Sequence, residues 1–119
     1  MSESPEISIV IPALNEAPNL PPLAERISAA LVGRDFEIII VDDNSRDDTQ
    51  AVCAELSKRY PLRLIVRSDA KDGLSGAVLR GFSEARGEYL LVMDVWFGYG
   101  RRIRLKDYPK PIYIVFPYF

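Results

Sequence analysis

Four short apolar runs, separated by three helical patterns, constrain the fold of this chain more than any other feature. The runs span residues 7–11, 36–41, 62–66 and 89–93. Runs of this length, bounded by breakers such as Pro12, are typical of strands buried on both faces. Apolar residues at steps of three and four mark the helices, within 20–31, 48–60 and 74–82. This alternation predicts an α/β fold with a mostly parallel sheet flanked by helices.

Polar segments follow the predicted strands at the places where a sheet of this kind binds ligands. In open parallel sheets, ligands bind beyond the carboxyl ends of the strands. The segments there are 12–16, 42–45, 67–73 and Asp94. None contains the glycine-rich phosphate loop of a dinucleotide binder. Gly76 and Gly81 instead follow the third strand, and we expect both to let a helix lie close to the sheet.

Asp42 and Asp43 form an acidic pair at the end of the second strand. Neighbouring residues of an extended chain face opposite ways, so one can serve the structure while the other reaches a ligand. A carboxylate here is suited to a nucleobase N–H or a ribose hydroxyl, and such a charged hydrogen bond contributes about 1.5–3 kcal/mol. The alternative is that 42–45 only builds a turn and caps the next helix.

Asp94 directly follows the fourth strand, where an α/β sheet can hold a divalent cation against diphosphate oxygens. Mg²⁺ commonly uses one or two carboxylates together with phosphate and water. The alternative for a single acid is an exposed strand-end residue. Glu16, taken alone, fits a solvated loop residue.

Four motifs carry a family resemblance: Ser8-Ile-Val-Ile-Pro-Ala-Leu-Asn-Glu16, Glu37-Ile-Ile-Ile-Val-Asp-Asp-Asn-Ser45, Gly73-Leu-Ser-Gly-Ala-Val-Leu-Arg-Gly-Phe82 and Ala85-Arg-Gly-Glu-Tyr-Leu-Leu-Val-Met-Asp94. In order and spacing they resemble family-2 glycosyltransferases of GT-A fold, with the closest likeness to polyprenol (dolichol) phosphate mannosyltransferases. The resemblance covers about residues 6–94. It implies the Rossmann-like nucleotide-binding half of a GT-A domain.

The resemblance also implies an activity and a set of site residues. The implied reaction transfers a hexose, commonly mannose, from a nucleoside-diphosphate sugar (GDP-mannose or a UDP-sugar) to a polyprenyl phosphate, with inversion at the anomeric carbon. The implied cofactor is Mg²⁺ or Mn²⁺, bound by Asp94 as the first acid of a D-x-D motif. The residues implied around the nucleotide sugar are Pro12, Leu14, Glu16, Val41, Asp43 and Asp94. No catalytic residue is assigned.

The composition changes abruptly after Asp94. Residues 1–94 hold 10 basic and 16 acidic residues, whereas 95–119 hold 5 basic and 1 acidic residue and 8 of the 12 aromatic residues. Trp96 stands where the second metal-binding acid of the motif is expected, and its indole offers a hard cation no lone pair. We therefore divide the chain into a nucleotide-sugar-binding half, 1–94, and a divergent tail, 95–119. These features predict a truncated or incomplete copy, in which 112–116 adds a strand or covers a sheet edge.

Charge, cysteine content and hydropathy limit the partners and the location. The net charge of −2 gives no basic field for nucleic acid, and the single Cys53 falls in a helical pattern as a small buried side chain. No signal peptide or membrane-spanning run is present, which predicts a cytoplasmic chain. The basic, aromatic tail also permits a peripheral contact with a membrane surface.

Two other functions fit parts of the sequence. The first is a response-regulator receiver domain, in which Asp94 would accept phosphate and the acidic pair would hold Mg²⁺. That alternative leaves the strand and helix of 7–31 without a role. The second is a non-catalytic fragment that retains nucleotide binding.

Overall fold

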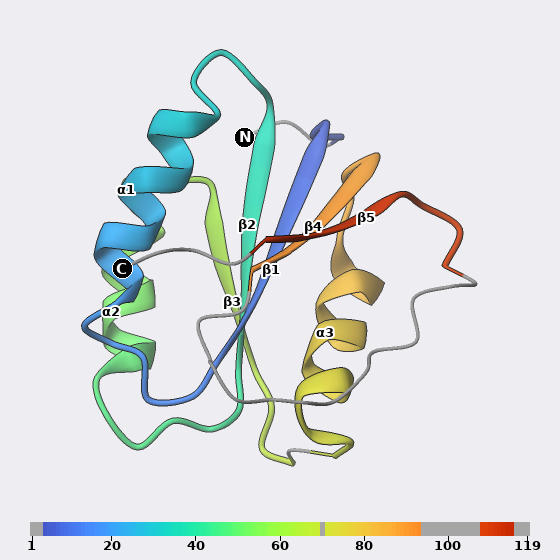
Figure 1. Cartoon of the computed structure of the whole chain (residues 1–119). Coiled ribbons are helices and arrows are strands. Elements are labelled where there is room, and N and C mark those ends of the chain that lie inside the picture. Colours follow the sequence, from blue (N-terminus) through green and yellow to red (C-terminus); the bar gives the residue numbers. More distant parts are fainter. Residues whose placement is uncertain (1–3, 70, 94–107, 116–119) are drawn as a thin grey trace.

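Strands and helices alternate along the chain in the order that the apolar pattern predicts. The computed structural model describes residues 4–69, 71–93 and 108–115. Its elements are β1 (Ile7–Ala13), α1 (Leu20–Ala30), β2 (Phe36–Asp42), α2 (Thr49–Leu56), β3 (Leu62–Val66), α3 (Gly73–Glu84), β4 (Tyr89–Met93) and β5 (Ile112–Val115) (Figure 1). The strands form one parallel sheet in the order β3-β2-β1-β4-β5. The predicted α/β fold with a parallel sheet and flanking helices is confirmed.

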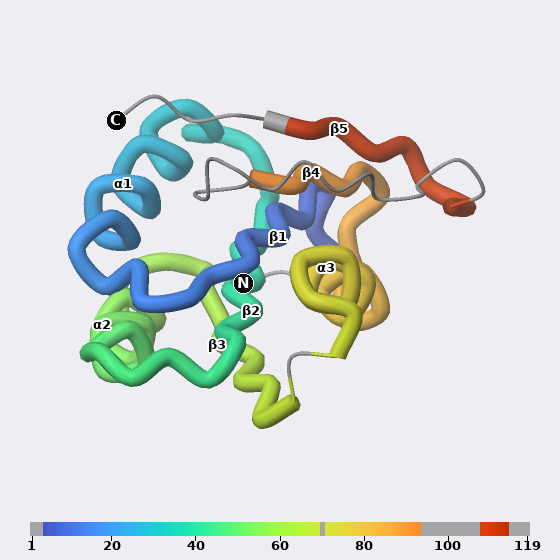
Figure 2. Tube along the Cα trace, turned by 60° about the horizontal axis from the view of Figure 1, so that its bottom comes forward, coloured from blue at the N-terminus to red at the C-terminus, as the bar shows by residue number. Residues whose placement is uncertain are grey.

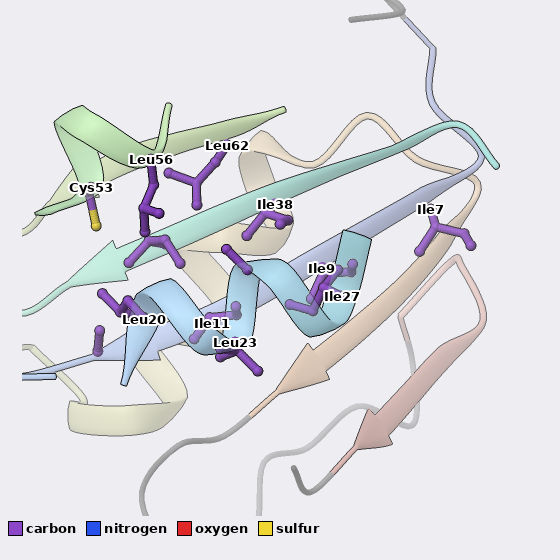
Figure 3. Packing of buried hydrophobic residues seen from close by; sticks show 13 residues of the cluster. Ile7, Ile9, Ile11, Leu20, Leu23, Ile27, Ile38, Cys53, Leu56 and Leu62 are labelled. Carbon is purple, nitrogen blue, oxygen red and sulfur yellow. The ribbon is translucent and has the colours of Figure 1, made fainter. Parts of the chain in front are cut away.

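The sheet lies between two layers of helices. Helices α1 and α2 cover one face and α3 covers the other (Figure 2). Each interface holds its own cluster of buried apolar residues. The cluster beneath α1 and α2 contains isoleucines of β1 and β2 and includes Cys53 (Figure 3). Because β1 and β2 contribute to both clusters, they form the centre of the core, as continuous apolar runs in a parallel sheet require.

The first strand is longer than its sequence pattern predicts. We expected Pro12 to end it, but β1 continues to Ala13. The carbonyl of Ala13 accepts the N–H of Asp43, so the main chain of Ala13 faces β2 and that of Pro12 faces β4. Among the described residues, pairing with β4 runs from Ile7 to Val10, opposite Tyr89 to Val92. The ladder to β2 therefore needs no N–H from Pro12, and the strand tolerates it.

Gly76 and Gly81 of α3 make room for different contacts. A Cβ added at Gly81 would lie 2.4 Å from Cγ1 of Val10 in the sheet, which confirms the expected close approach of the helix. Our prediction for Gly76 was wrong. A Cβ there would lie 2.0 Å from the carbonyl oxygen of Lys71 and 2.6 Å from Nη1 of Arg67, so Gly76 makes room for the preceding loop.

A buried polar network fixes the amino ends of the central strands. Glu37 is 1% exposed and accepts hydrogen bonds from Ser8 Oγ (2.6 Å), Arg63 Nη2 (3.2 Å) and the Arg86 amide (2.7 Å). Ser8 Oγ in turn accepts the amide of Gly87 at 2.7 Å. A buried carboxylate needs such partners, and these join the sheet to the loop between α3 and β4.

Part of the compositionally distinct tail completes the sheet. Residues Ile112–Val115 form β5 parallel to β4, which confirms the expectation of an added strand. Tyr108 packs against Phe82 of α3 with ring centroids 5.0 Å apart, and Lys110 Nζ donates to the carbonyl of Gly87 at 2.7 Å. These contacts attach the strand to the face covered by α3.

Candidate functional site

Three loops meet at the carboxyl edge of the sheet. The first loop, 14–19, follows β1, the second loop, 43–48, follows β2, and the third loop, 67–72, follows β3. Two backbone hydrogen bonds extend the ladders into these loops, from the Asp43 amide to Ala13 and from the Arg67 amide to Asp42. Since β3, β2 and β1 are neighbours, the loops that carry Glu16, Asp43 and Arg67 start side by side.

The backbone of the first loop donates to side chains that follow β2. The distances are 2.8 Å from the Asn15 amide to Ser45 Oγ, 3.1 Å from the Glu16 amide to Thr49 Oγ1, and 3.2 Å from the Ala17 amide to Asp47 Oδ2. Three successive amides near the start of α1 thus find acceptors in the second loop and at the first residue of α2. No ligand is needed to satisfy them.

Two backbone amides of the second loop donate hydrogen bonds to Asn15. The side-chain oxygen Oδ1 of Asn15 accepts the amides of Arg46 at 2.9 Å and Asp47 at 3.3 Å. Asn15 holds the left-handed backbone conformation, with φ 54°. We call these five cross-loop hydrogen bonds, made through Asn15, Ser45, Asp47 and Thr49, the loop clasp. It joins the two loops that contain Leu14, Glu16 and Asp43, three of the six predicted site residues.

The acidic pair at the end of β2 divides into two roles. Asp42 is fully buried and closes the turn, because its carboxylate accepts the Ser45 amide (3.1 Å), the Ser45 hydroxyl and Gln50 Nε2 (3.2 Å). The turn alternative is therefore correct for Asp42. The side chain of Asp43 is 16% exposed and points elsewhere, as opposite-facing neighbours predict.

Asp43 forms a two-point ion pair with Arg67. The guanidinium donates from Nε to Oδ1 at 2.6 Å and from Nη2 to Oδ2 at 3.0 Å. The Arg67 side chain is only 9% exposed. Two parallel charged hydrogen bonds fix both the position and the plane of the carboxylate. Each carboxylate oxygen keeps a further lone pair for another donor.

Arg67 also orders the loop that leads into α3. Its guanidinium donates to the carbonyls of Lys71 and Gly73, both at 3.0 Å. The backbone turns there through Asp72, with φ 62°, and Gly76 leaves space for the packed loop. One arginine thus connects β2, the third loop and the start of α3.

The remaining predicted residues lie on or just beneath the same edge. Leu14 and Glu16 are partly exposed, and Glu16 Oε2 accepts Asn19 Nδ2 at 2.7 Å. Pro12 and Val41 are register partners in β1 and β2, and both are buried. The Val41 side chain is 0% exposed and packs beneath α3. Leu14, Glu16 and Asp43 are thus the predicted residues that present side chains to solvent here.

Sequence reasoning missed the residues that position the site. Arg67 had a usable signal, since it is the first residue after the third strand and lies two strands from the first loop. Asn15 and Thr49 had none beyond their polar character, because their partners lie more than 30 residues away in the sequence. Asp48 precedes α2 but makes no capping hydrogen bond with its side chain.

The carboxylates at this edge do not form a metal-binding cluster among the described residues. The residues that the structure describes contain no group of three or more His, Cys, Asp or Glu side chains placed to hold a metal ion. The predicted metal ligand Asp94 and its neighbour Trp96 lie outside those residues. The described side chains therefore do not fit a complete divalent-cation site.

Two surface hollows lie beside other parts of the sheet and helices, and one of them reaches the second loop at Asp48. One is bordered by the starts of β2 and β3, including Phe36 and Tyr60, and the other lies between α1 and α2 beside Pro21 and Leu56. Neither is lined by a predicted site residue. Across 4–69, 71–93 and 108–115, the helices are all too short or too polar to cross a bilayer.

Comparison with known proteins gives the family. The model described as "Glycosyl transferase family 2" matches residues 8–95, which is most of the chain. The chain belongs to glycosyl transferase family 2. The match ends beside Asp94, where the composition changes, so the family-2 region and the region of predicted motifs coincide.

Several relatives of this family-2 chain have names that include a lipid phosphate. The dolichol-phosphate mannosyltransferase of Pyrococcus furiosus is 48% identical over 89 residues, covering 75% of this chain and 25% of the relative. The enzyme of that name from Saccharomyces cerevisiae is 43% identical, with 75% and 34% covered. The undecaprenyl-phosphate 4-deoxy-4-formamido-L-arabinose transferase of an Enterobacter species is 33% identical, with 75% and 28% covered. The chain thus spans about a quarter to a third of these relatives.

Solved structures support the family-2 fold. The mannosyltransferase PcManGT of Pyrobaculum calidifontis, in complex with GDP-Man and Mn²⁺, matches with a TM-score of 0.60 at 23% identity, covering 78% of this chain and 28% of that one. Residues 1–349 of S. aureus TarS match with a TM-score of 0.62 at 22% identity, covering 75% and 27%. At this identity they establish the GT-A-like architecture, and with the family they displace the receiver-domain alternative.

Proposed function

We propose that residues 1–94 are the nucleotide-sugar-binding half of an inverting hexosyltransferase. The donor is a nucleoside-diphosphate sugar, most simply GDP-mannose, and the acceptor is a polyprenyl phosphate. Family membership and the names of the relatives support the reaction class and the lipid-phosphate acceptor. The structural neighbour that binds GDP-Man supports the donor class. Residues 95–119 form a divergent tail in this proposal.

The proposed reaction is a single displacement. An oxygen of the acceptor phosphate attacks the anomeric carbon as the bond from that carbon to the nucleoside diphosphate breaks, and the diphosphate leaves. The acceptor is already an anion, so the step needs less help from a general base than a sugar hydroxyl would. The binding half has to hold the nucleotide so that the anomeric carbon faces the acceptor.

Asp43 carries this proposal. Its carboxylate lies at the carboxyl edge of the sheet, partly exposed and held in one orientation by Arg67. A carboxylate held in this way can accept hydrogen bonds from the N–H edge of a nucleobase or from the hydroxyls of a ribose. The fixed geometry means that a bound nucleotide does not have to order this side chain.

The other residues take supporting positions around the nucleotide. Leu14 provides an apolar contact, and Glu16 provides a second carboxylate that can accept hydrogen bonds. Both residues lie in the first loop. Pro12 and Val41 are buried, so we assign them a role through the main chain and the floor of the site.

The metal of the family is assigned only one protein ligand here. Asp94 would hold Mg²⁺ or Mn²⁺, whose role in such chemistry is to offset charge on the departing diphosphate. Trp96 cannot replace the second acid. We therefore propose that this chain binds nucleotide but does not turn over by itself, in the cytoplasm or at a membrane surface that supplies the lipid phosphate.

Isothermal titration tests the nucleotide site. We expect the folded chain to bind GDP or UDP, or their sugars. Replacing Asp43 with Ala should weaken that binding about 10- to 100-fold, the loss expected for one charged hydrogen bond. Asp43→Asn retains an acceptor for Arg67 and should show a similar loss of affinity with a smaller effect on stability.

Asp48→Ala is the matched control, because Asp48 is exposed in the same loop and makes no capping hydrogen bond with its side chain. Its affinity should equal that of the parent chain. If the folded parent chain binds neither GDP nor UDP, nor a sugar of either nucleotide, the proposal is overturned.

A further inference from the structure

We infer that Asn15 is a positioning residue of the nucleotide site, acting through the loop clasp rather than by touching the ligand. This inference rests on the proposed function. The first loop carries Leu14 and Glu16, and the second carries Asp43. A single nucleotide can contact both loops without having to order them only if their separation is already fixed. The clasp joins the loops at Asn15, next to Glu16, and at Ser45, two residues after Asp43.

Asn15 combines two properties that few residues share. Its φ of 54° lies in the left-handed region, which Gly, Asn and Asp adopt most readily. Its side-chain oxygen also accepts two amides from the opposite loop, those of Arg46 and Asp47. Glycine would meet the first requirement but not the second, whereas aspartate would meet both. The two requirements can therefore be separated by substitution.

The clasp is local, so its loss should affect the site more than the fold. Its five hydrogen bonds lie at the exposed or half-buried edge, whereas the apolar clusters and the Glu37 network lie deeper. Loops at such edges open at low free energy while the core stays folded. Without Asn15 Oδ1, the loops would sample more separations, and nucleotide binding would have to order them.

Asn44 offers a matched control. It lies in the second loop with a similar left-handed backbone, φ 60°, and is exposed. Within the described part of the chain, no hydrogen bond joins its side chain to the first loop. Asn44→Gly therefore reproduces the backbone change of Asn15→Gly at a neighbouring position and leaves the clasp intact.

The experiment compares the parent chain with Asn15→Gly, Asn15→Asp and Asn44→Gly. It measures affinity for GDP and UDP by titration, the midpoint of thermal unfolding, and hydrogen exchange of the Arg46 and Asp47 amides. We expect Asn15→Gly to weaken nucleotide binding about 10-fold or more, as the loss of two hydrogen bonds implies, and to speed exchange at both amides. Asn15→Asp should stay within about threefold of the parent affinity, and Asn44→Gly should match it.

The outcomes separate this inference from the proposed function. If the parent chain binds no nucleotide, the proposed function fails and Asn15 has nothing to position. If the parent binds and Asn15→Gly binds equally well, only the positioning role is overturned. It is also overturned if Asn15→Gly loses affinity only in proportion to a lowered unfolding midpoint and Asn15→Asp does not rescue it, because that pattern marks a purely structural residue.

Discussion

At the scale of single residues, burial and partners decide what chemically similar side chains do. Asp42 and Asp43 are adjacent, yet one is sealed in a turn and the other meets Arg67 at the surface of the site. Lysine could not replace Arg67. A lysine has a single charged nitrogen, whereas the planar guanidinium donates two hydrogen bonds to the Asp43 carboxylate and others to two backbone carbonyls.

Cys53 shows the same dependence on its surroundings. It is 1% exposed, and burial, with a smaller contribution from the charge of Asp42, raises the pKa of its thiol to about 12. We predict that iodoacetamide at pH 8 labels the folded chain at least about 100-fold more slowly than an exposed thiol, because the thiolate is the reacting form. Mass spectrometry measures the rate. Unfolding in guanidinium is the control and should restore full labelling, while fast labelling of the folded chain would contradict this burial.

The sequence allowed us to propose the acidic residues of the site, but not the residues that hold them and their loops in place. Asp43 stood out because an acidic pair directly follows an apolar strand. The ion pair with Arg67 joins residues 24 apart, and the clasp joins residues about 30 apart. Such contacts depend on which strands become neighbours and at what register, and local patterns do not encode this.

At the scale of elements, hydrophobic periodicity was sufficient because β1 and β2 are buried on both faces and β3 and β4 bury most of their apolar residues at least partly. The predicted runs 62–66 and 89–93 coincide with β3 and β4, and the stripe within 74–82 falls inside α3. The error at Pro12 came from treating proline as a strand breaker without knowing which neighbour its nitrogen faces. The error at Gly76 came from assigning both Gly76 and Gly81 to the contact with the sheet.

Packing of α3 on the sheet gives a prediction for Gly81. Alanine favours helix over glycine by about 1 kcal/mol, but its Cβ would press on the β-branched Val10, and overpacking costs about 1–3 kcal/mol. We expect Gly81→Ala to lower the free energy of unfolding by up to about 2 kcal/mol in urea titrations, the difference of those two effects.

A double variant controls for the cause of that loss. Val10→Ala removes the methyl groups that an alanine at position 81 would meet. Combined with Gly81→Ala, it should destabilise the chain by less than the sum of the single changes, since the two sites are in contact. If the losses of stability in the two single variants simply add in the double variant, crowding between α3 and β1 is not the cause of the loss in Gly81→Ala.

At the scale of the whole molecule, the family-2 region and part of the tail beyond the family match share one sheet. The family match stops at residue 95, yet β5 lies parallel to β4 and continues the order of strands. The tail was predictable only as a possible strand, because its apolar run has no motif and its neighbour in the sheet is set by tertiary contacts such as Tyr108 with Phe82.

Trp96 gives a prediction for the chain of residues 1–119. With GDP present, Trp96→Asp should strengthen Mn²⁺ binding about 10-fold, because it restores a second oxygen ligand for a hard cation. Sugar transfer from GDP-mannose to a polyprenyl phosphate should stay undetectable. Titration and a radiolabelled transfer assay measure the two effects. Trp96→Ala, which removes the indole without adding an acid, should leave metal affinity unchanged, and measurable transfer by either variant would show that the chain alone suffices for catalysis.

The parallel direction of β5 has an evolutionary and practical consequence. A strand that lies beyond the family match pairs with β4 by supplying a short apolar run and a few anchoring side chains. The described residues of the core beneath α1 and α2 all precede Asp94. We therefore expect Met93 to mark a junction, after which recombination or protein engineering can graft a different partner region while keeping the three loops at the carboxyl edge in register.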